Sequence, residues 1–409
     1  MEDFMQYAIV ILDGASGDPV EAFDGQTTFE VSRTPHLDAL AQAGTVGLMQ
    51  NVPSDMESCS NVACMSIVGY DPETYPIGRG AIEGAALGID LKPGQVACRL
   101  NLCNVENGIM KLYSTDNIDT EESHKLAREL KEALDDETFE LHLGTSFRHI
   151  LVVNGHPELM DLAYETPHDN TNLDITEAYK PKAADAVGQV GADLVVDYIR
   201  RANEVLAKSP NNVRRIAEGL APANFVWIFW PGMRPASMPT FEEAFHKTAA
   251  MNSAVDLLDG IALLTAMKVY KFDGVTDGPN NDFNAQGQGG IKMLEDGADV
   301  VVIHVEAPDA AGHDGRPDEK KNGIEQSDTL ILGPLCEYAE THPLRIAVMP
   351  DHPTPLTTRK HSYDPVPFVI AGPGVARNEA TRATEAQAKD SGILIDPGYT
   401  FLADYLLAE

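Results

Sequence analysis

Residues 7–14 read YAIVILDG, an apolar run that leads directly into an aspartate and a glycine. A run of this length, rich in β-branched residues, is typical of a strand buried on both faces of a parallel sheet. The pattern returns at 300–305, where VVVIHV precedes EAPDAAGHDG, and at 345–349, where RIAVM precedes PDH. In open α/β sheets, ligands bind beyond the carboxyl ends of the strands. The sequence therefore predicts an α/β fold whose functional residues follow its strands.

Helix-compatible segments separate these runs, as expected of a mostly parallel sheet flanked by helices. Within this alternation, we expect further strands at 226–230 and 368–371. Helices are expected at 254–266, 285–295 and 321–340.

The segment 96–153 has a different pattern, which predicts an inserted α+β domain. Two expected strands flank a turn at Asn107-Gly108, and a helix is expected at 121–134. The helical stretch 183–220 would complete the insertion.

We therefore expect a discontinuous first domain at 1–85 and 236–409 and an inserted domain at 86–235. The active site would lie in a cleft between the two domains.

Composition restricts the class of partner. Among 409 residues, 63 are acidic and 30 basic, for a formal net charge of −33. This charge argues against nucleic acid or an anionic membrane as a partner, but metal ions in a cleft would still allow a small anionic substrate. Five cysteines without a C-x-x-C pair favour reduced thiols. We find no signal-peptide pattern and no apolar run of about 20 residues, and so expect a cytoplasmic protein.

Three aspartates and three histidines follow the expected strands. A lone aspartate at a strand end is more often a turn residue or a helix cap, so the functional interpretation depends on the convergence of all six. A mixed set of carboxylates and imidazoles suits Zn, Mn or Fe, and six ligands suffice for two divalent ions. The six residues are Asp13, Asp309, His313, Asp351, His352 and His361.

Ser60 stands in a turn of small residues before the apolar run 62–68. A serine at a helix N-terminus faces free backbone N–H groups and the positive end of the helix dipole. This setting favours a serine oxygen that becomes an anion and holds a phosphoryl group, and a neighbouring metal would complete its activation.

Four segments, ILDG, SNVACMSIVGYDP, VEAPDAAGHDG and MPDHPTPLTTRKHSYDPVPF, resemble in order and spacing the archaeal-type cofactor-independent phosphoglycerate mutases of the alkaline phosphatase superfamily. The resemblance also includes SFRHILVV, ETPHDN and WPGMRP. It implies an alkaline-phosphatase-like, mostly parallel sheet flanked by helices and interrupted by an inserted α+β domain that binds substrate. It also implies interconversion of 3-phosphoglycerate and 2-phosphoglycerate through a phosphoserine, independently of 2,3-bisphosphoglycerate.

The resemblance further implies a two-metal site with Ser60 as the phosphorylated nucleophile. The ions would be Mn²⁺ or Zn²⁺, with Co²⁺ or Mg²⁺ as further candidates, and no organic cofactor is expected. One ion would be bound by Asp13, Ser60, Asp351 and His352, and the other by Asp309, His313 and His361.

By the same resemblance, Arg148 and Arg234 would contact the carboxylate or phosphate of the substrate, and Asn61 would contact it near the nucleophile. His168 and Asp169 are candidates for proton transfer to and from the glycerate hydroxyls. Arginine suits the first role because its planar guanidinium can donate two parallel hydrogen bonds to a carboxylate or a phosphate.

Two departures from the family pattern leave the substrate open. Cys59-Ser60-Asn61 stands where Gly-Ser-Asp is usual, and Asp116-Asn117 where Gly-His is usual. Two alternatives share the metal centre: a homoserine-kinase-like phosphotransferase that uses ATP, and a metal-dependent phosphatase or phosphodiesterase. A binding module without activity is disfavoured, because it has no use for a nucleophile among six ligands. The native metal and the oligomeric state, a homo-oligomer included, stay open.

Overall fold

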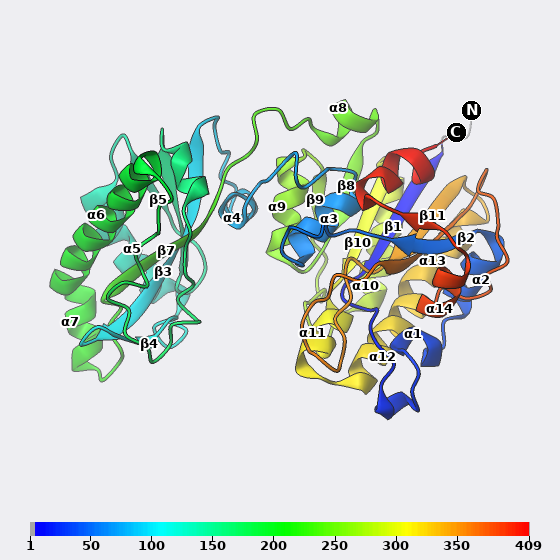
Figure 1. Ribbon diagram of the computed structural model, residues 1–409, viewed down its shortest axis with the longest axis horizontal. Helices are drawn as coiled ribbons and strands as arrows, with labels where there is room; N and C mark the ends of the chain where they lie inside the picture. Colours follow the sequence, from blue (N-terminus) through cyan, green and yellow to red (C-terminus); the bar gives the residue numbers. More distant parts are fainter. Residues whose placement is uncertain (1–4, 409) are drawn as a thin grey trace. The chain divides into compact units, whose positions relative to one another are not determined.

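Residues 5–408 are described by a computed structural model and form two compact units (Figure 1). The first unit comprises the chain up to Tyr75 and the segment from Ser237 onward, and the second comprises Pro76–Ala236. Each unit has its own sheet and its own apolar core. No helix within the described range has the length and apolar character to cross a bilayer. The five cysteines all lie in this range and are free thiols.

The first unit contains, in its described residues, an eight-stranded sheet that is mostly parallel. β1 lies between β10 and β11 and is parallel to both, and β8 continues the parallel order beyond β10. The expected α/β fold with a mostly parallel sheet is thereby confirmed. In order across the sheet, the strands are β13 (Leu394–Ile395), β2 (Thr45–Met49), β12 (Val366–Ala371), β11 (Leu344–Met349), β1 (Gln6–Leu12), β10 (Val300–Val305), β8 (Ala249–Asn252) and β9 (Lys268–Tyr270).

The strand expected at 368–371 forms, as β12, but it runs antiparallel to both of its neighbours, β11 and β2. The expectation of a parallel strand at this position was wrong. An apolar run of six buried residues fits either direction, because it carries no information about which neighbour it will meet.

Helices cover both faces of the first sheet, which explains why its central strands are continuous apolar runs. Val10 of β1 shares one apolar cluster with Met293 and Leu335, whereas the next residue, Ile11, points to the opposite face and is equally buried. The helices of this unit are α1 (Thr28–Val31), α2 (Pro35–Ala43), α3 (Ser60–Ile67), α8 (Phe241–Phe245), α9 (Asp256–Leu264), α10 (Phe283–Glu295), α11 (Ala307–Asp314), α12 (Pro317–Ser327), α13 (Gly333–Ala339) and α14 (Glu385–Asp390).

The single helix expected at 321–340 is interrupted. α12 ends at Ser327, a π-helical turn covers Asp328–Leu332, and α13 begins at Gly333. Pro334 accounts for the break, because it has no N–H to continue the helical ladder and its ring crowds the preceding turn.

The second unit, which is described in full, has a five-stranded antiparallel sheet. The order is β4 (Ile109–Leu112), β3 (Gln95–Glu106), β6 (Arg148–Asn154) and β5 (Phe139–His142), and β7 (Phe225–Gly232) pairs with β3. The strand at 226–230 thus lies, within β7, in this sheet and is antiparallel to β3, so its expected place in the parallel alternation was wrong. Asn107 and Gly108 have positive φ angles of 51° and 79° in the expected turn.

One face of the second sheet is covered by helices. Leu100 of β3, Leu130 of α5 and Ile199 of α6 belong to the same apolar core. The helices of this unit are α4 (Arg79–Ala86), α5 (Thr120–Leu134), α6 (Ala186–Lys208) and α7 (Pro210–Ala217).

Candidate metal centre

The carboxyl ends of β1, β10 and β11 deliver the candidate ligands to one place in the first unit. Asp13 follows β1 directly, Asp309 and His313 lie on α11 after β10, and Asp351 and His352 follow β11. Because β1 lies between the other two strands, these side chains converge although they are far apart in sequence.

Gly14 allows this close approach. Its φ is +58°, and a Cβ atom here would lie 2.4 Å from Asp309 Oδ1. Its backbone N–H donates to Asp351 Oδ1 over 3.1 Å. Only glycine combines this backbone conformation with the space required, which gives a physical reason for the Asp-Gly pair after the first strand.

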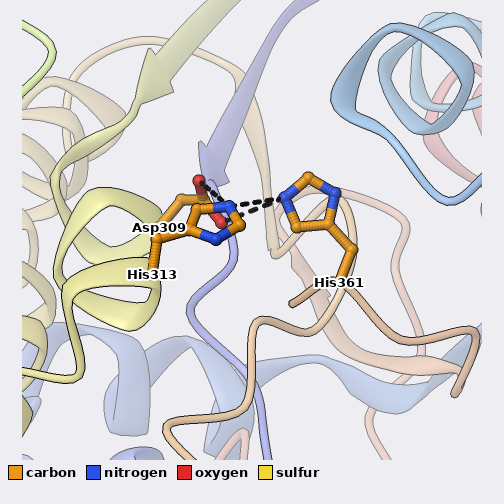
Figure 2. A group of neighbouring side chains, drawn as sticks. All are labelled: Asp309, His313 and His361. Carbon is orange, nitrogen blue, oxygen red and sulfur yellow. Dashed lines mark hydrogen bonds and ion pairs between the residues drawn. The ribbon is translucent and has the colours of Figure 1, made fainter. Parts of the chain in front are cut away.

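Asp309, His313 and His361 form the first ligand group (Figure 2). The Nε2 atoms of the two histidines lie 2.9 Å apart, and His313 Nε2 is 3.2 Å from Asp309 Oδ2. The Nδ1 atoms lie 3.0 Å from the carbonyl oxygen of Arg359 and 2.9 Å from that of Ser58. A carbonyl oxygen only accepts a hydrogen bond, so each Nδ1 carries an N–H and each Nε2 is the nitrogen that can bind a proton or a metal ion. Two Nε2 atoms and a carboxylate that face one another can hold such a cation between them.

The charges in this group favour that cation. Burial alone would raise the pKa of Asp309, but hydrogen bonds from His313 and Thr354 outweigh it and lower the pKa to about 2. The bond to Asp309 raises the pKa of His313 to about 9. The site therefore attracts a positive charge strongly, and a divalent ion can replace the proton.

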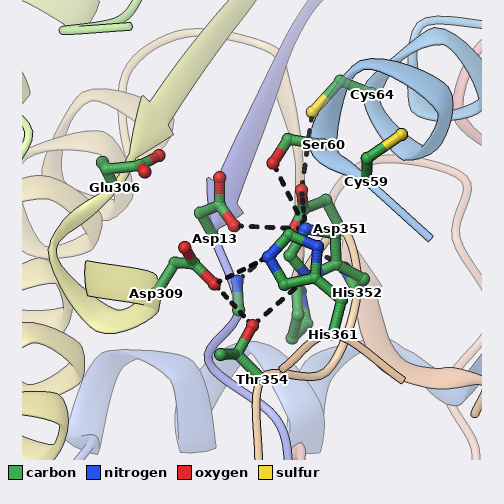
Figure 3. Close-up of polar contacts among 12 residues, drawn as sticks. Asp13, Cys59, Ser60, Cys64, Glu306, Asp309, Asp351, His352, Thr354 and His361 are labelled. Carbon is green, nitrogen blue, oxygen red and sulfur yellow. Dashed lines mark hydrogen bonds and ion pairs between the residues drawn. The ribbon is translucent and has the colours of Figure 1, made fainter. Parts of the chain in front are cut away.

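Asp13, Ser60, Asp351 and His352 form the second ligand group (Figure 3). His352 Nε2 lies 3.2 Å from Ser60 Oγ, 3.3 Å from Asp351 Oδ2 and 3.7 Å from Asp13 Oδ1. Asp13, Asp351 and His352 are each at most 1% exposed. Three fully buried polar side chains thus meet the half-buried Ser60 at one place.

The carboxylate of Asp13 is buried without enough positive charge around it to balance its own charge. Burial, followed by the charges of Asp351 and Asp309, raises its pKa well above the usual value. Its Oδ1 is buried and has no hydrogen-bond partner among the described residues. A buried carboxylate oxygen without a partner is costly unless a cation binds it, so the residues fit a second divalent ion.

Ser60 is the first residue of α3, and Asn61 is the second. Both side chains are half-buried. The N-cap residue, Cys59, makes no side-chain cap, so the first N–H groups of the helix are available to an anion. The φ of Cys59 is −154°, an extended conformation that any residue adopts, so a cysteine fits where the family pattern has glycine.

Sequence reasoning missed several residues that support this cluster: His304, Glu306, Thr354 and Lys320. Thr354 Oγ1 donates to Asp309, and Lys320 is fully buried and donates to the carbonyl oxygens of Ser16 and Thr354. His304 could have been found from the sequence, because it is the one polar residue in VVVIHV and a buried histidine needs partners. Thr354 and Lys320 carry no comparable local signal.

The remaining sequence candidates lie in the second unit. His168 Nε2 is 4.0 Å from Asp169 Oδ2, and Thr166 Oγ1 donates to the same carboxylate oxygen. Both side chains are exposed, at 47% and 74%. Arg234 is half-buried and adds, after Lys92, to the positive field that lowers the pKa of Asp90.

Aromatic contacts connect His168 to two arginines. On one side its ring lies 6.2 Å from Tyr113, whose ring in turn contacts Phe147 beneath the guanidinium of Arg148. On the other side it lies 6.1 Å from Trp230, and the Arg79 guanidinium stacks 4.0 Å above that indole. A series of ring contacts thus links Arg148 to His168 and also to Arg79, which the sequence did not single out.

The fold and the site define a class: an α/β protein with a candidate two-metal centre and a helix-terminal serine at the carboxyl ends of its parallel strands. Residues 41–212 match the family model of 2,3-bisphosphoglycerate-independent phosphoglycerate mutase. The protein of that name from Methanosarcina barkeri is 36% identical over 95% of this chain and 96% of its own, and that from Pyrococcus horikoshii is 34% identical over 94% and 92%. The chain therefore belongs to the 2,3-bisphosphoglycerate-independent phosphoglycerate mutase family.

Solved structures agree with this fold along almost the whole chain. A Pyrococcus horikoshii protein superposes with a TM-score of 0.80 at 28% identity, covering 98% of this chain and 96% of its own. The cofactor-independent phosphoglycerate mutase from Thermoplasma acidophilum gives a TM-score of 0.72 at 24% identity, covering 98% and 99%.

Proposed function

We propose that this chain interconverts 3-phosphoglycerate and 2-phosphoglycerate through a phosphoserine at Ser60, without 2,3-bisphosphoglycerate. The observation that carries the proposal is the position of Ser60 Oγ, 3.2 Å from His352 Nε2 and at the first residue of α3. The names of the relatives, at identities of 33–37%, support the same reaction.

The proposal includes two divalent ions. The mixed set of carboxylate and imidazole donors favours Mn²⁺ or Zn²⁺. Bound ions would lower the pKa of the Ser60 hydroxyl and neutralise charge on the transferring phosphoryl group. The first ion would be held by Asp309, His313 and His361, and the second by Asp13, Ser60, Asp351 and His352.

Ser60 Oγ would attack the phosphorus of 3-phosphoglycerate in line, forming an Oγ–P bond as the bond to the C3 oxygen breaks. The released C3 alkoxide takes up a proton. Glycerate then turns, its C2 hydroxyl loses a proton and attacks the phosphoserine, and Ser60 is regenerated. Free N–H groups at the start of α3 would bind the phosphoryl oxygens in both steps.

The second unit would hold the glycerate. Arg148 and Arg234 are proposed to bind its carboxylate or phosphate, and His168 or Asp169 to move the protons between its hydroxyls. Asn61 would contact the substrate beside Ser60. Retention of glycerate is essential, because water reaching the phosphoserine would convert the mutase into a phosphatase.

The proposal places the enzyme in the cytoplasm, where this reaction belongs to central carbon metabolism. Five free cysteines, of which Cys64, Cys98 and Cys103 are buried, suit a reducing compartment.

Phosphorus NMR with Mn²⁺ and 3-phosphoglycerate, and no bisphosphoglycerate, tests the function. We expect 2-phosphoglycerate from the native protein and none after treatment with EDTA or in Ser60→Ala. Ser66→Ala is the matched control on the same helix, because its hydroxyl donates to the carbonyl oxygen of Asn51 instead. Inorganic phosphate as the only product would identify a phosphatase. No reaction would redirect the assay to ATP and homoserine.

A further inference from the structure

A chain of three buried side chains runs from β8 to the second ligand group. Ser253 Oγ lies 3.0 Å from His304 Nδ1, and His304 Nε2 lies 2.8 Å from Asp13 Oδ2. All three residues are 0% exposed. Ser253 follows β8, His304 lies within β10 and Asp13 follows β1, so three adjacent parallel strands contribute one residue each.

The hydrogen bonds determine where the protons lie. The backbone N–H of Val255 donates to Ser253 Oγ over 2.9 Å, so that oxygen already accepts one bond. The hydroxyl proton has no other acceptor among the described residues, and it therefore points to His304 Nδ1. His304 is then the tautomer with its proton on Nε2, and this N–H donates to Asp13 Oδ2.

The two carboxylate oxygens of Asp13 therefore have different surroundings. Oδ2 is engaged by His304, whereas Oδ1 has no hydrogen-bond partner in the described part of the chain. Oδ1 is the oxygen that approaches His352 Nε2, at 3.7 Å, and that nitrogen is the neighbour of Ser60 Oγ. Figure 3 shows Asp13 directed toward this group.

We propose that His304, anchored by Ser253, is a positioning residue that holds the Asp13 carboxylate so that Oδ1 alone binds the cation beside Ser60. The inference rests on the proposed function, because it assumes that a divalent ion binds there. Partners that donate to metal-binding side chains fix their orientation, and their loss typically costs about 10- to 100-fold in metal affinity.

A competing arrangement uses the same residues. Asp13, His304 and Glu306 have ligand atoms close enough to hold a cation of their own. In that case His304 Nε2 would be a metal ligand and could not carry the proton that the Ser253 bond requires. The two arrangements therefore predict different metal stoichiometries.

Calorimetric titration of the metal-free protein with Mn²⁺ tests the inference. The titration uses a His313→Ala background, which disables the first ligand group, so that the remaining binding reports the ion beside Ser60. We expect His304→Asn to weaken this binding by about 10- to 100-fold. His304→Gln should stay within about threefold, because its amide nitrogen reaches the position of Nε2 and can still donate to Asp13. Ser253→Ala should fall between the two.

His149→Asn is the matched control. His149 is 1% exposed and, like His304, engages both ring nitrogens, with Ser123 Oγ 2.9 Å from Nε2 and the Gly144 N–H 3.1 Å from Nδ1. It lies in the second unit. Its loss should lower thermal stability as the loss of His304 does, but leave Mn²⁺ affinity unchanged.

The outcomes separate the two proposals. If the His313→Ala protein itself binds no Mn²⁺, the proposed two-metal function fails. If it binds Mn²⁺ and His304→Asn binds equally well, only the positioning role is overturned. A whole equivalent of metal lost from His304→Asn and His304→Gln alike would also overturn it, in favour of the competing site.

Discussion

His313 and His361 approach each other through their Nε2 atoms, 2.9 Å apart, while both Nδ1 atoms lie near backbone carbonyl oxygens. Two imidazoles in this arrangement share either a proton or a metal ion. The pKa of about 9 at His313, caused mainly by its bond to Asp309, indicates how strongly the metal-free site holds the proton.

The first prediction concerns pH. Because the pKa of His313 in the folded protein, about 9, lies above the ordinary imidazole value of 6.5, the stabilisation from its bond to Asp309 is complete below about pH 6.5 and is lost as pH rises through about 9. The side chain is 43% exposed, so screening limits the effect to less than about 1 kcal/mol. Urea unfolding in EDTA at pH 6.5, 8 and 9 measures it. His313→Asn should lack this decline, and an equal decline in both proteins would assign it to other groups.

The second prediction concerns Gly14. An added Cβ would meet Asp309 Oδ1 at 2.4 Å in a backbone with φ of +58°. We expect Gly14→Ala to lose at least about 2 kcal/mol of stability and to weaken Mn²⁺ binding, because strain and displacement of Asp309 act together. Gly25→Ala is the control, since it has φ of +78° but no atom within 4 Å. It should cost about 1 kcal/mol and leave metal affinity intact. Equal behaviour of the two variants in calorimetry would contradict the proposed crowding.

The third prediction concerns Lys320, whose Nζ donates to the carbonyl oxygens of Ser16 and Thr354 and so ties the loop after β1 to the loop after β11. Burial lowers the pKa of Lys320 to about 8, although the negative charges of Asp309 and other carboxylates act to raise it. Lys320→Met should cost about 2–3 kcal/mol, because it removes a buried cation and leaves the carbonyl oxygen of Thr354 unpaired, while that of Ser16 keeps only the backbone N–H of Thr354.

Lys321→Met is the neighbouring control. Lys321 is 36% exposed and pairs only loosely with Glu325, at 3.7 Å. Its replacement should change stability by no more than about 0.5 kcal/mol. Urea denaturation of both variants decides the matter, and a neutral Lys320→Met would show that the two loops are held by other contacts.

The fourth prediction concerns substrate binding in the second unit. If Arg148 binds the carboxylate or phosphate of the substrate, Arg148→Ala should raise KM by about 10- to 100-fold, the loss expected for one charged hydrogen bond. Mn²⁺ affinity should not change, since Arg148 and the proposed metal ligands belong to different units. Arg200→Ala, which removes an exposed guanidinium paired with Asp197 and Glu204, should leave both quantities unchanged. An unaltered KM in Arg148→Ala would remove this residue from the substrate site.

Much of the fold follows from local pattern. The run 7–12 and the run 300–305 are strands with nearly the expected ends, because apolar runs of this kind are stable only when buried on both faces. The direction of β12 and the sheet to which β7 belongs did not follow. Both depend on pairing with strands that are distant in sequence, and a local sequence pattern does not indicate which strands will pair.

The order of residues along the chain is enough to predict which chemical groups the candidate site contains. Asp13, Asp309, Asp351 and their histidines could be recognised because each follows a strand, and strand ends gather at one edge of a parallel sheet. The folded chain is needed to see that His304, a residue 291 positions away, holds one oxygen of Asp13, while the other has no hydrogen-bond partner among the described residues. A proton on a ring nitrogen depends on every neighbour that the nitrogen meets, and those neighbours come together only when the chain folds.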